Sequence, residues 1–296
     1  MPRIISTMAV WNGAGWLPYN LRWMYPVFDD IYIVEANWTS DDPRWGSDTS
    51  PDGTADIIRG YPDPEHKIHL LQMGRIHVPR TPIAGYSTAL HTLFRQIEKA
   101  DWVWEVCSDE FYPQSLIDTV VREIPEFDRR GYTTIGIPSR NFYYDFTHHT
   151  EEHACRIRKW AKGFTHWGPC YTYPKELNLS DGYQYEQAKM GLELFHYSYV
   201  PLQGAEIKAC MVDDVQDPNR YRDWYRNTLS KYDGTNLEEV YATNQGGVHV
   251  FGGLPLLRYY GEHPSILSTH PLRTARWWKG KYEDETGAEL EAQGWW

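Results

Sequence analysis

The sequence predicts an α/β fold with a mostly parallel central sheet, helices on both faces, and a mixed α+β second half. Two observations support this class. Apolar, β-branched segments alternate with segments of helical apolar spacing over residues 3–123, and such alternation is typical of a parallel sheet. Later in the chain, strand-like segments follow one another with few long helices between them, which indicates the mixed half.

Each element of the first half has its own signal. Strands are predicted where β-branched and apolar residues cluster, at 3–10, 30–35, 67–72 and 102–106. Helices are predicted where apolar residues recur every three or four positions, at 17–25, 54–59, 86–99 and 113–123. The segment 36–53 is rich in Ser, Asp, Pro and Gly, so we expect a loop there.

The second half is expected to contain further short strands and an appended segment. Strands are predicted at 133–137, 142–144, 155–159 and 194–200, and a charged, aromatic helix at 217–229. We expect a main domain over 1–215, with halves at 1–112 and 113–215. A helical or irregular extension would occupy 216–296.

Composition narrows the class of protein. No stretch approaches the roughly 20 apolar residues of a membrane span, and the first residues run straight into a strand pattern, so we expect a soluble, cytoplasmic protein. The net charge of −11 opposes wide contact with nucleic acid. The four cysteines lie far apart and are expected to be free thiols. The 14 Trp and 22 Tyr residues suit sugar faces and nucleobases, although such rings also fill cores.

Two adjacent carboxylates, Asp109 and Glu110, follow the predicted strand 102–106. A buried parallel strand would deliver them to its carboxyl end, where open α/β sheets bind charged ligands. Acidic oxygens there suit Mg²⁺ or Mn²⁺ carrying phosphates. The structural alternative for Asp109 is a helix cap, and Glu110 would either orient an acceptor or hold an arginine. The pair points to nucleotide-sugar chemistry.

Two early segments carry a family resemblance. Residues 4–13 look like the opening strand and loop of the GT-A glycosyltransferases of the family 2 type, and the strand ending in Glu35 looks like the second strand. The later Asp52-Gly53-Thr54 resembles the D-G-T turn of that family. The resemblance extends over about residues 3–210 and implies a Rossmann-like sheet whose first half binds a nucleotide sugar.

Two later segments carry the same resemblance. Residues 107–111, Cys-Ser-Asp-Glu-Phe, are similar to the D-x-D-E-F motif that holds metal and diphosphate, with Cys107 in place of the first acid. This leaves Asp109 as the surviving ligand. Residues 194–200, followed by Lys208, resemble the late H-Y-x-Y segment, whose histidine often completes the metal site.

The resemblance implies roles for individual residues. Asp109 and His196 would hold Mn²⁺ or Mg²⁺, with a hydrogen-bonded core histidine as the alternative for His196. The donor-binding residues that it implies are Glu35, Asp52, Ser108, Asp109, Arg156 and Lys208. The catalytic residues that it implies are Glu110 and a general base, Asp181, for which Asp145, Glu176 and Glu186 are alternatives.

The sequence therefore predicts a metal-assisted glycosyltransferase of the hexosyltransferase type, and the resemblance implies that transfer proceeds with inversion. The donor would be a nucleoside diphosphate sugar, UDP-sugar favoured, and the acceptor a hydroxyl of a glycan or small molecule. A nucleotidyltransferase would need a G-x-G-T-R loop, which Asn12-Gly13-Ala14-Gly15 matches poorly. A non-catalytic carbohydrate-binding protein on the same scaffold would explain Cys107.

Two weaker alternatives rest on short clusters. A modified nucleic acid acceptor would use a basic, aromatic patch, which consists of Arg273, Arg276, Trp277, Trp278, Lys279 and Lys281. A zinc site would use His149 and His153, which would lie one turn apart on a helix.

Overall fold

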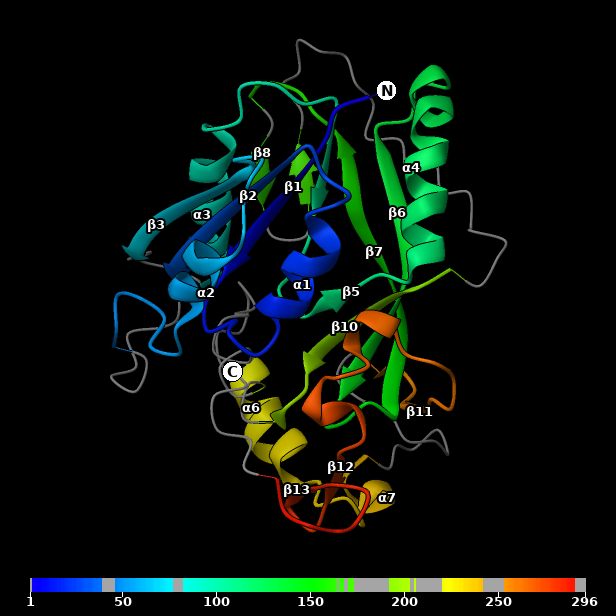
Figure 1. Cartoon of the computed structure of the whole chain (residues 1–296). Coiled ribbons are helices and arrows are strands. Elements are labelled where there is room, and N and C mark those ends of the chain that lie inside the picture. The colour runs from blue at the N-terminus through cyan, green and yellow to red at the C-terminus, as the bar shows by residue number, and fades with distance from the viewer. Residues whose placement is uncertain are drawn as a thin grey trace.

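The fold has a large central sheet, and helices pack against it (Figure 1). The computed structural model describes residues 2–38, 46–76, 82–163, 165–167, 170–172, 192–202, 205, 220–241 and 253–290. Within these residues the main strands are β1 Ile4–Val10, β2 Asp30–Asn37, β3 Ile68–Arg75, β4 Trp102–Glu105, β5 Glu110–Phe111, β6 Thr134–Tyr143, β7 His148–Lys159, β10 Leu194–Tyr199 and β11 Leu257–Arg258. Two small hairpins are β8 Thr165–Trp167 with β9 Cys170–Thr172, and β12 Arg276–Trp278 with β13 Lys281–Glu283.

The described helices are α1 Leu17–Met24, α2 Thr54–Gly60, α3 Pro82–Phe94, α4 Gln114–Arg129, α6 Arg220–Asn227 and α7 Leu237–Tyr241. Short 3-10 turns are η3 Leu229–Lys231, η5 Ser265–Leu267 and η6 Pro271–Arg273. None of these described helices combines the length and the apolar character that crossing a bilayer requires.

The large sheet has the order β3-β2-β1-β4-β7-β6-β10-β5, with β11 paired to β7. Strands β3, β2, β1 and β4 are parallel neighbours, and β10 is parallel to β6. Strand β7 is antiparallel to β4, β6 and β11, and β5 is antiparallel to β10. Among the described strands of this sheet, all except β5 and β7 therefore run in one direction, as predicted. The architecture is α/β and consistent with a GT-A, Rossmann-like fold.

Alternate residues of the strands bury against helices on the two faces of the sheet. In β1, Ile5 and Ala9 pack in one apolar cluster with Leu90 of α3, whereas Ile4 and Met8 belong to a second cluster. That second cluster also contains the buried apolar residues of α1 and α4, and Ile58 of α2. Because side chains alternate along a strand, one apolar strand supports helices on both faces.

The strand predictions were accurate in the parallel half and less so beyond it. Predicted strands 133–137 and 142–144 are one strand, β6, because the polar stretch between them pairs with β7 and β10. Strand β7 begins at His148, seven residues before the predicted start at 155. The described part of the C-terminal segment shares the main core, where Leu229, Leu267 and Leu272 are buried with residues of α1 and β6.

Candidate active site

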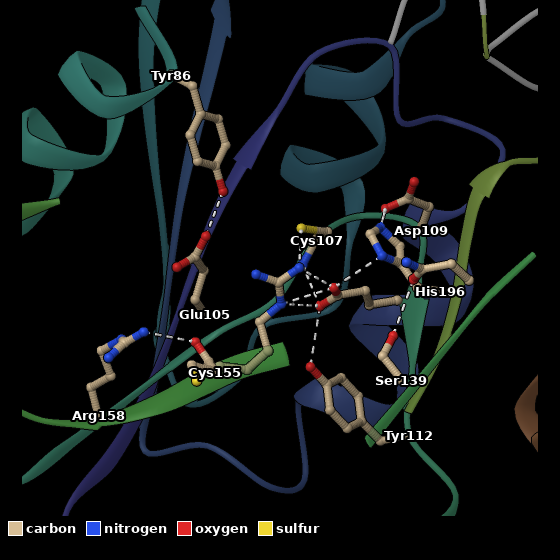
Figure 2. Close-up of polar contacts among 12 residues, drawn as sticks. Tyr86, Glu105, Cys107, Asp109, Tyr112, Ser139, Cys155, Arg158 and His196 are labelled. Atoms are coloured by element: carbon tan, nitrogen blue, oxygen red, sulfur yellow. Dashed lines mark hydrogen bonds and ion pairs between the residues drawn. The ribbon is translucent and has the colours of Figure 1, made fainter. Parts of the chain in front are cut away.

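The predicted carboxylates follow the carboxyl end of β4, beside the paired strands β5 and β10. Figure 2 shows the side chain of Asp109 next to that of His196. Asp109 and Glu110 follow β4, and Glu110 begins β5. Strand β5 pairs with β10 so that Glu110 lies opposite His196. The pairing brings together two segments that are distant in the sequence, and it places Asp109, Glu110 and His196 side by side.

Three different elements fix the backbone of residues 107–109. The Cys107 carbonyl accepts a hydrogen bond from the amide of Glu110, and the Asp109 carbonyl accepts one from the amide of Tyr197 in β10. The Ser108 carbonyl accepts one from the Asn20 side chain of α1. Asn20 is fully buried, and its own oxygen accepts from Trp23 Nε1 at 2.8 Å. Three anchored carbonyls in succession leave this turn little freedom, so the direction of its side chains is set by the fold.

Glu110 is a fully buried carboxylate held by a guanidinium. Arg156 Nε donates to Glu110 Oε1 at 2.8 Å and to Oε2 at 3.1 Å, and Arg156 Nη2 also donates to Oε1. Tyr112 OH and the amide of Cys107 each donate to Oε2 at 3.2 Å. Burial raises the pKa of the Glu110 carboxyl, but Arg156 and His196 outweigh it, and the pKa lies below its usual value. Of the two expectations for Glu110, the one in which it holds an arginine matches these contacts.

His196 lies between the two carboxylates. Its Nε2 is 3.2 Å from Asp109 Oδ1, and its Nδ1 is 3.5 Å from Glu110 Oε1. An imidazole whose one nitrogen faces a carboxylate keeps the other in a fixed orientation and tautomer, an arrangement common around metal-binding histidines. Asp109 and His196 remain partly accessible, with 18% and 12% of their side chains exposed, whereas Glu110 has none.

His196 has possible metal ligands on two sides, Cys107 and Glu110 on one and Asp109 on the other. The side with Cys107 and Glu110 is the less suitable for a divalent cation. Cys107, Glu110 and His196 each offer a ligand atom within 4.8 Å of the others. On that side, however, Arg156 Nη2 lies 3.7 Å from Cys107 Sγ, so its positive charge opposes a second cation. Burial and the Glu110 carboxylate raise the pKa of the Cys107 thiol, which disfavours the thiolate that binds metals.

On the side of Asp109, the spacing of two ligand atoms suits a divalent cation. Two ligands at right angles on an octahedral ion with bonds of about 2.1 Å lie about 3 Å apart. The 3.2 Å between Asp109 Oδ1 and His196 Nε2 agrees with that spacing. One carboxylate oxygen and one imidazole nitrogen at this distance could therefore hold a divalent ion such as Mn²⁺.

The turn at Asp52-Gly53-Thr54 fastens the loop after β1. Three successive backbone amides of that loop donate hydrogen bonds to side-chain oxygens of residues 50–54. Asn12 N donates to Ser50 Oγ at 3.1 Å, Gly13 N to Thr54 Oγ1 at 2.8 Å, and Ala14 N to Asp52 Oδ2 at 2.9 Å. A Cβ on Gly13 would lie 2.5 Å from Val10 Cγ2 and 3.4 Å from Ser108 Cβ, so only glycine fits this close approach. The loop after β1 therefore lies directly beside residues 107–111.

Glu35 is buried, and both of its carboxylate oxygens accept hydrogen bonds from other residues of the chain. Its Oε1 accepts from both the amide and the hydroxyl of Ser50 at 2.6 Å, and its Oε2 accepts from Gln72 Nε2 at 3.1 Å. No part of the residue is exposed. In this arrangement Glu35 anchors the loop after β2, and a nucleobase would reach it only after one of these partners moved.

Several predicted residues lie elsewhere. Asp181, Lys208 and the alternative bases Glu176 and Glu186 are outside the described residues. Asp145 is buried, with Oδ1 2.9 Å from His148 Nδ1 and Oδ2 accepting from the amide of Trp277 at 3.4 Å. It thus ties the C-terminal hairpin to the start of β7.

The zinc alternative does not agree with the structure. His149 and His153 lie in strand β7 and not on a helix. Residues four apart in a strand are about 13 Å from one another, too far to share one ion.

The basic patch is partly neutralised by its own neighbours. Arg276 Nη2 lies 3.1 Å from Glu283 Oε2, and Lys281 Nζ lies 3.2 Å from Glu289 Oε2. Trp277 is 7% exposed and donates through Nε1 to the Tyr232 carbonyl, so its ring is not available for base stacking. The structure therefore gives little support to a nucleic acid acceptor at this patch.

Sequence reasoning did not single out Asn20, Tyr112, Ser50 or Gln72 as supports of the site. Asn20 had a signal: it occupies the apolar face of α1, between Leu17 and Leu21, where a buried amide needs partners. The roles of Tyr112, Ser50 and Gln72 depend on contacts between segments distant in the sequence, which a local sequence pattern does not predict.

No protein-family profile matches the chain, and no curated protein is significantly similar to it in sequence. Among solved structures, residues 1–349 of TarS from S. aureus are 11% identical, with a TM-score of 0.38 over 82% of this chain and 76% of that one. A second TarS structure is 12% identical, with a TM-score of 0.40, and the alignment spans 82% of this chain but only 46% of that one. Mannose-1-phosphate geranyltransferase from Thermus thermophilus is 12% identical, with a TM-score of 0.26 over 86% of this chain and 76% of that one. These likenesses are remote, and the assignments that follow rest on the geometry of this chain.

Proposed function

We propose that the chain is a glycosyltransferase that moves a sugar from a nucleoside diphosphate sugar to a hydroxyl acceptor with the help of a divalent cation. The observation that carries the proposal is the pair formed by Asp109 Oδ1 and His196 Nε2, 3.2 Å apart and partly accessible at the carboxyl edge of the sheet. Glu110, itself held by Arg156, faces the other nitrogen of the imidazole. Such a supported ligand pair is typical of a metal site in an α/β fold.

Asp109 and His196 would hold the cation, and a nitrogen ligand favours Mn²⁺ over Mg²⁺, which strongly prefers oxygen. When bound, the cation would neutralise charge on the departing nucleoside diphosphate. Arg156 would help to bind the phosphate groups. Its Nε and Nη2 are committed to Glu110, whereas Nη1 makes no hydrogen bond among the described residues, and 20% of the side chain is exposed. Glu110 thus fixes a guanidinium whose free edge suits phosphate oxygens.

The loop after β1 supports a transferase over a nucleotidyltransferase. A glycine-rich phosphate loop binds its ligand through free backbone amides. Here the amides of Asn12, Gly13 and Ala14 already donate to Ser50, Thr54 and Asp52. Phosphate groups would therefore be held by side chains and the cation and not by this loop.

The remaining parts of the reaction follow from the family resemblance. We propose a UDP-sugar as donor, inversion at the anomeric carbon, and Asp181 as the base that removes the proton of the acceptor hydroxyl. Asp52 and Ser108 lie in the two loops that meet beside Gly13, which suits contacts with the donor. Lys208 would neutralise phosphate.

The test is the substitution Asp109→Asn, which keeps the shape of the side chain and removes its charge. We expect Mn²⁺-dependent turnover or hydrolysis of a UDP-sugar to fall at least about 100-fold, because charge stabilisation at a leaving group is usually the largest catalytic term. The thermal midpoint should stay close to wild type, since Asp109 is at the surface of the site. The matched control is Asp56→Asn, at a carboxylate that is 86% exposed on α2, which should leave turnover unchanged.

Two results would argue against parts of this proposal. Full activity of Asp109→Asn would remove the metal assignment. Sugar binding by the wild type that responds to neither Mn²⁺ nor UDP, together with an absence of turnover, would favour the carbohydrate-binding protein.

A further inference from the structure

Trp16 connects the site to the C-terminal segment. It lies at the start of α1, directly after the loop that follows β1, and it is 5% exposed. Its ring stacks on Tyr197 with centroids 5.3 Å apart and on His270 with centroids 4.3 Å apart. Its centroid is also 5.6 Å from that of Phe111. One indole therefore contacts three chain segments that are distant in the sequence.

Two of these contacts are made by the immediate neighbours of site residues. Phe111 follows Glu110 in β5, and Tyr197 follows His196 in β10. Because side chains alternate across a strand, the site residues occupy one face of this strand pair and the two aromatic rings the other. The Trp16 ring fills the space behind the pair that carries the site.

Two histidines of the C-terminal segment hold these rings in place. His263 Nδ1 lies 2.8 Å from Tyr197 OH, so the segment is hydrogen-bonded to the residue after His196. His270 accepts from the amide of Leu272 through Nδ1 at 3.2 Å and is 3% exposed. Burial lowers the pKa of His270 to about 3 and of His263 to about 4, so both rings are neutral at physiological pH.

We propose that His263 and His270 are positioning residues for the metal pair, acting through Tyr197 and Trp16, so that residues 263–273 form part of the active-site frame. The inference rests on the proposed function for its metal readout. Packed cores transmit displacements because they contain few voids, and a metal site tolerates only about 0.5 Å of error in its ligands. Loss of the ring behind β5 and β10 would alter the separation of Asp109 and His196 without touching either residue.

The experiment compares His270→Ala with Tyr282→Phe in the full chain. Tyr282 belongs to the same C-terminal segment, but its hydroxyl bonds Leu202 N at 2.7 Å and the Tyr144 carbonyl at 2.6 Å, so its loss weakens the attachment of the segment elsewhere. Mn²⁺ affinity is measured by calorimetry without nucleotide, alongside the thermal midpoint. We expect His270→Ala to weaken Mn²⁺ binding about 10-fold, the lower end of the effect of lost outer contacts at metal sites, and Tyr282→Phe to leave it unchanged. His270→Gln, which retains hydrogen-bonding capacity, should recover part of the affinity.

Equal Mn²⁺ affinity in His270→Ala and wild type would overturn the inference, as would equal weakening in both variants, because a merely structural role predicts no difference between them. Failure of the proposed function has a different signature: wild type and Asp109→Asn would then bind Mn²⁺ equally, or not at all. In that case amide hydrogen exchange decides the positioning claim. Faster exchange at residues 107–111 and 194–199 in His270→Ala, but not in Tyr282→Phe, supports it, and identical exchange in both refutes it.

Discussion

Arg156→Met is expected to lower the free energy of unfolding by about 3–5 kcal/mol, because it leaves a buried carboxylate without its counter-ion. Glu110 has no exposed surface, and Arg156 supplies the charge that offsets the cost of burying it. Tyr112 and the Cys107 amide would remain as donors, but neither carries a positive charge. Urea denaturation at pH 7, read at constant slope, measures the loss.

Two further variants separate the ion pair from other effects of the substitution. Lys159→Met on the same strand breaks a pair with Asp128 at 2.6 Å, but both side chains are more than a third exposed, so it should cost under about 1 kcal/mol. Adding Glu110→Gln to Arg156→Met should restore much of the lost stability, because it removes the stranded charge. A loss below about 1 kcal/mol in Arg156→Met alone would contradict the view that this pair is a buried structural ion pair.

Local patterns sufficed for the parallel half of the sheet. Strands β1, β2 and β4 are buried on both faces, so their apolar runs are nearly continuous and easy to recognise. Strand β6 was predicted as two strands because Ser139 and Asn141 look like loop residues. They are buried polar residues that bond each other at 3.1 Å within the strand, and only the presence of β7 and β10 on either side makes that favourable.

The parts of the site that depend on position along a predicted strand could be predicted from the sequence. Asp109 and Glu110 lie where the end of a buried strand places them, whereas the partner of each carboxylate is decided by tertiary contacts. Glu35 illustrates the limit. Its place near the end of β2 was evident, but its hydrogen bonds with Ser50 and Gln72 depend on a loop that folds back and on the neighbouring strand β3. Likewise, nothing local indicates that Arg156 lies beside Glu110, because β7 reaches it only through the sheet order.

Acidification from pH 7 to pH 5 is expected to destabilise the protein through its buried neutral histidines. Burial lowers the pKa of His149 and His263 to about 4 and of His270 to about 3, against about 6.5 in the unfolded chain. The unfolded state therefore binds more protons than the native state over this range, and stability falls as the pH falls. Each histidine contributes a loss of about 2 kcal/mol between pH 7 and pH 5, so the three together remove about 5–6 kcal/mol, a large share of the stability of a typical domain. Carboxylates with a lowered pKa, such as Asp145, contribute mainly below this range.

Urea denaturation of wild type and His270→Phe at both pH values tests this effect of acidification. The variant should lose about 2 kcal/mol less than wild type, because it lacks one of the three rings that take up a proton on unfolding. His66→Asn, at an exposed histidine with φ 54° that asparagine tolerates, is the control and should leave the pH dependence unchanged. Equal stability of the wild type at pH 5 and pH 7 would show that these rings take up protons without unfolding, and that their burial does not hold them neutral.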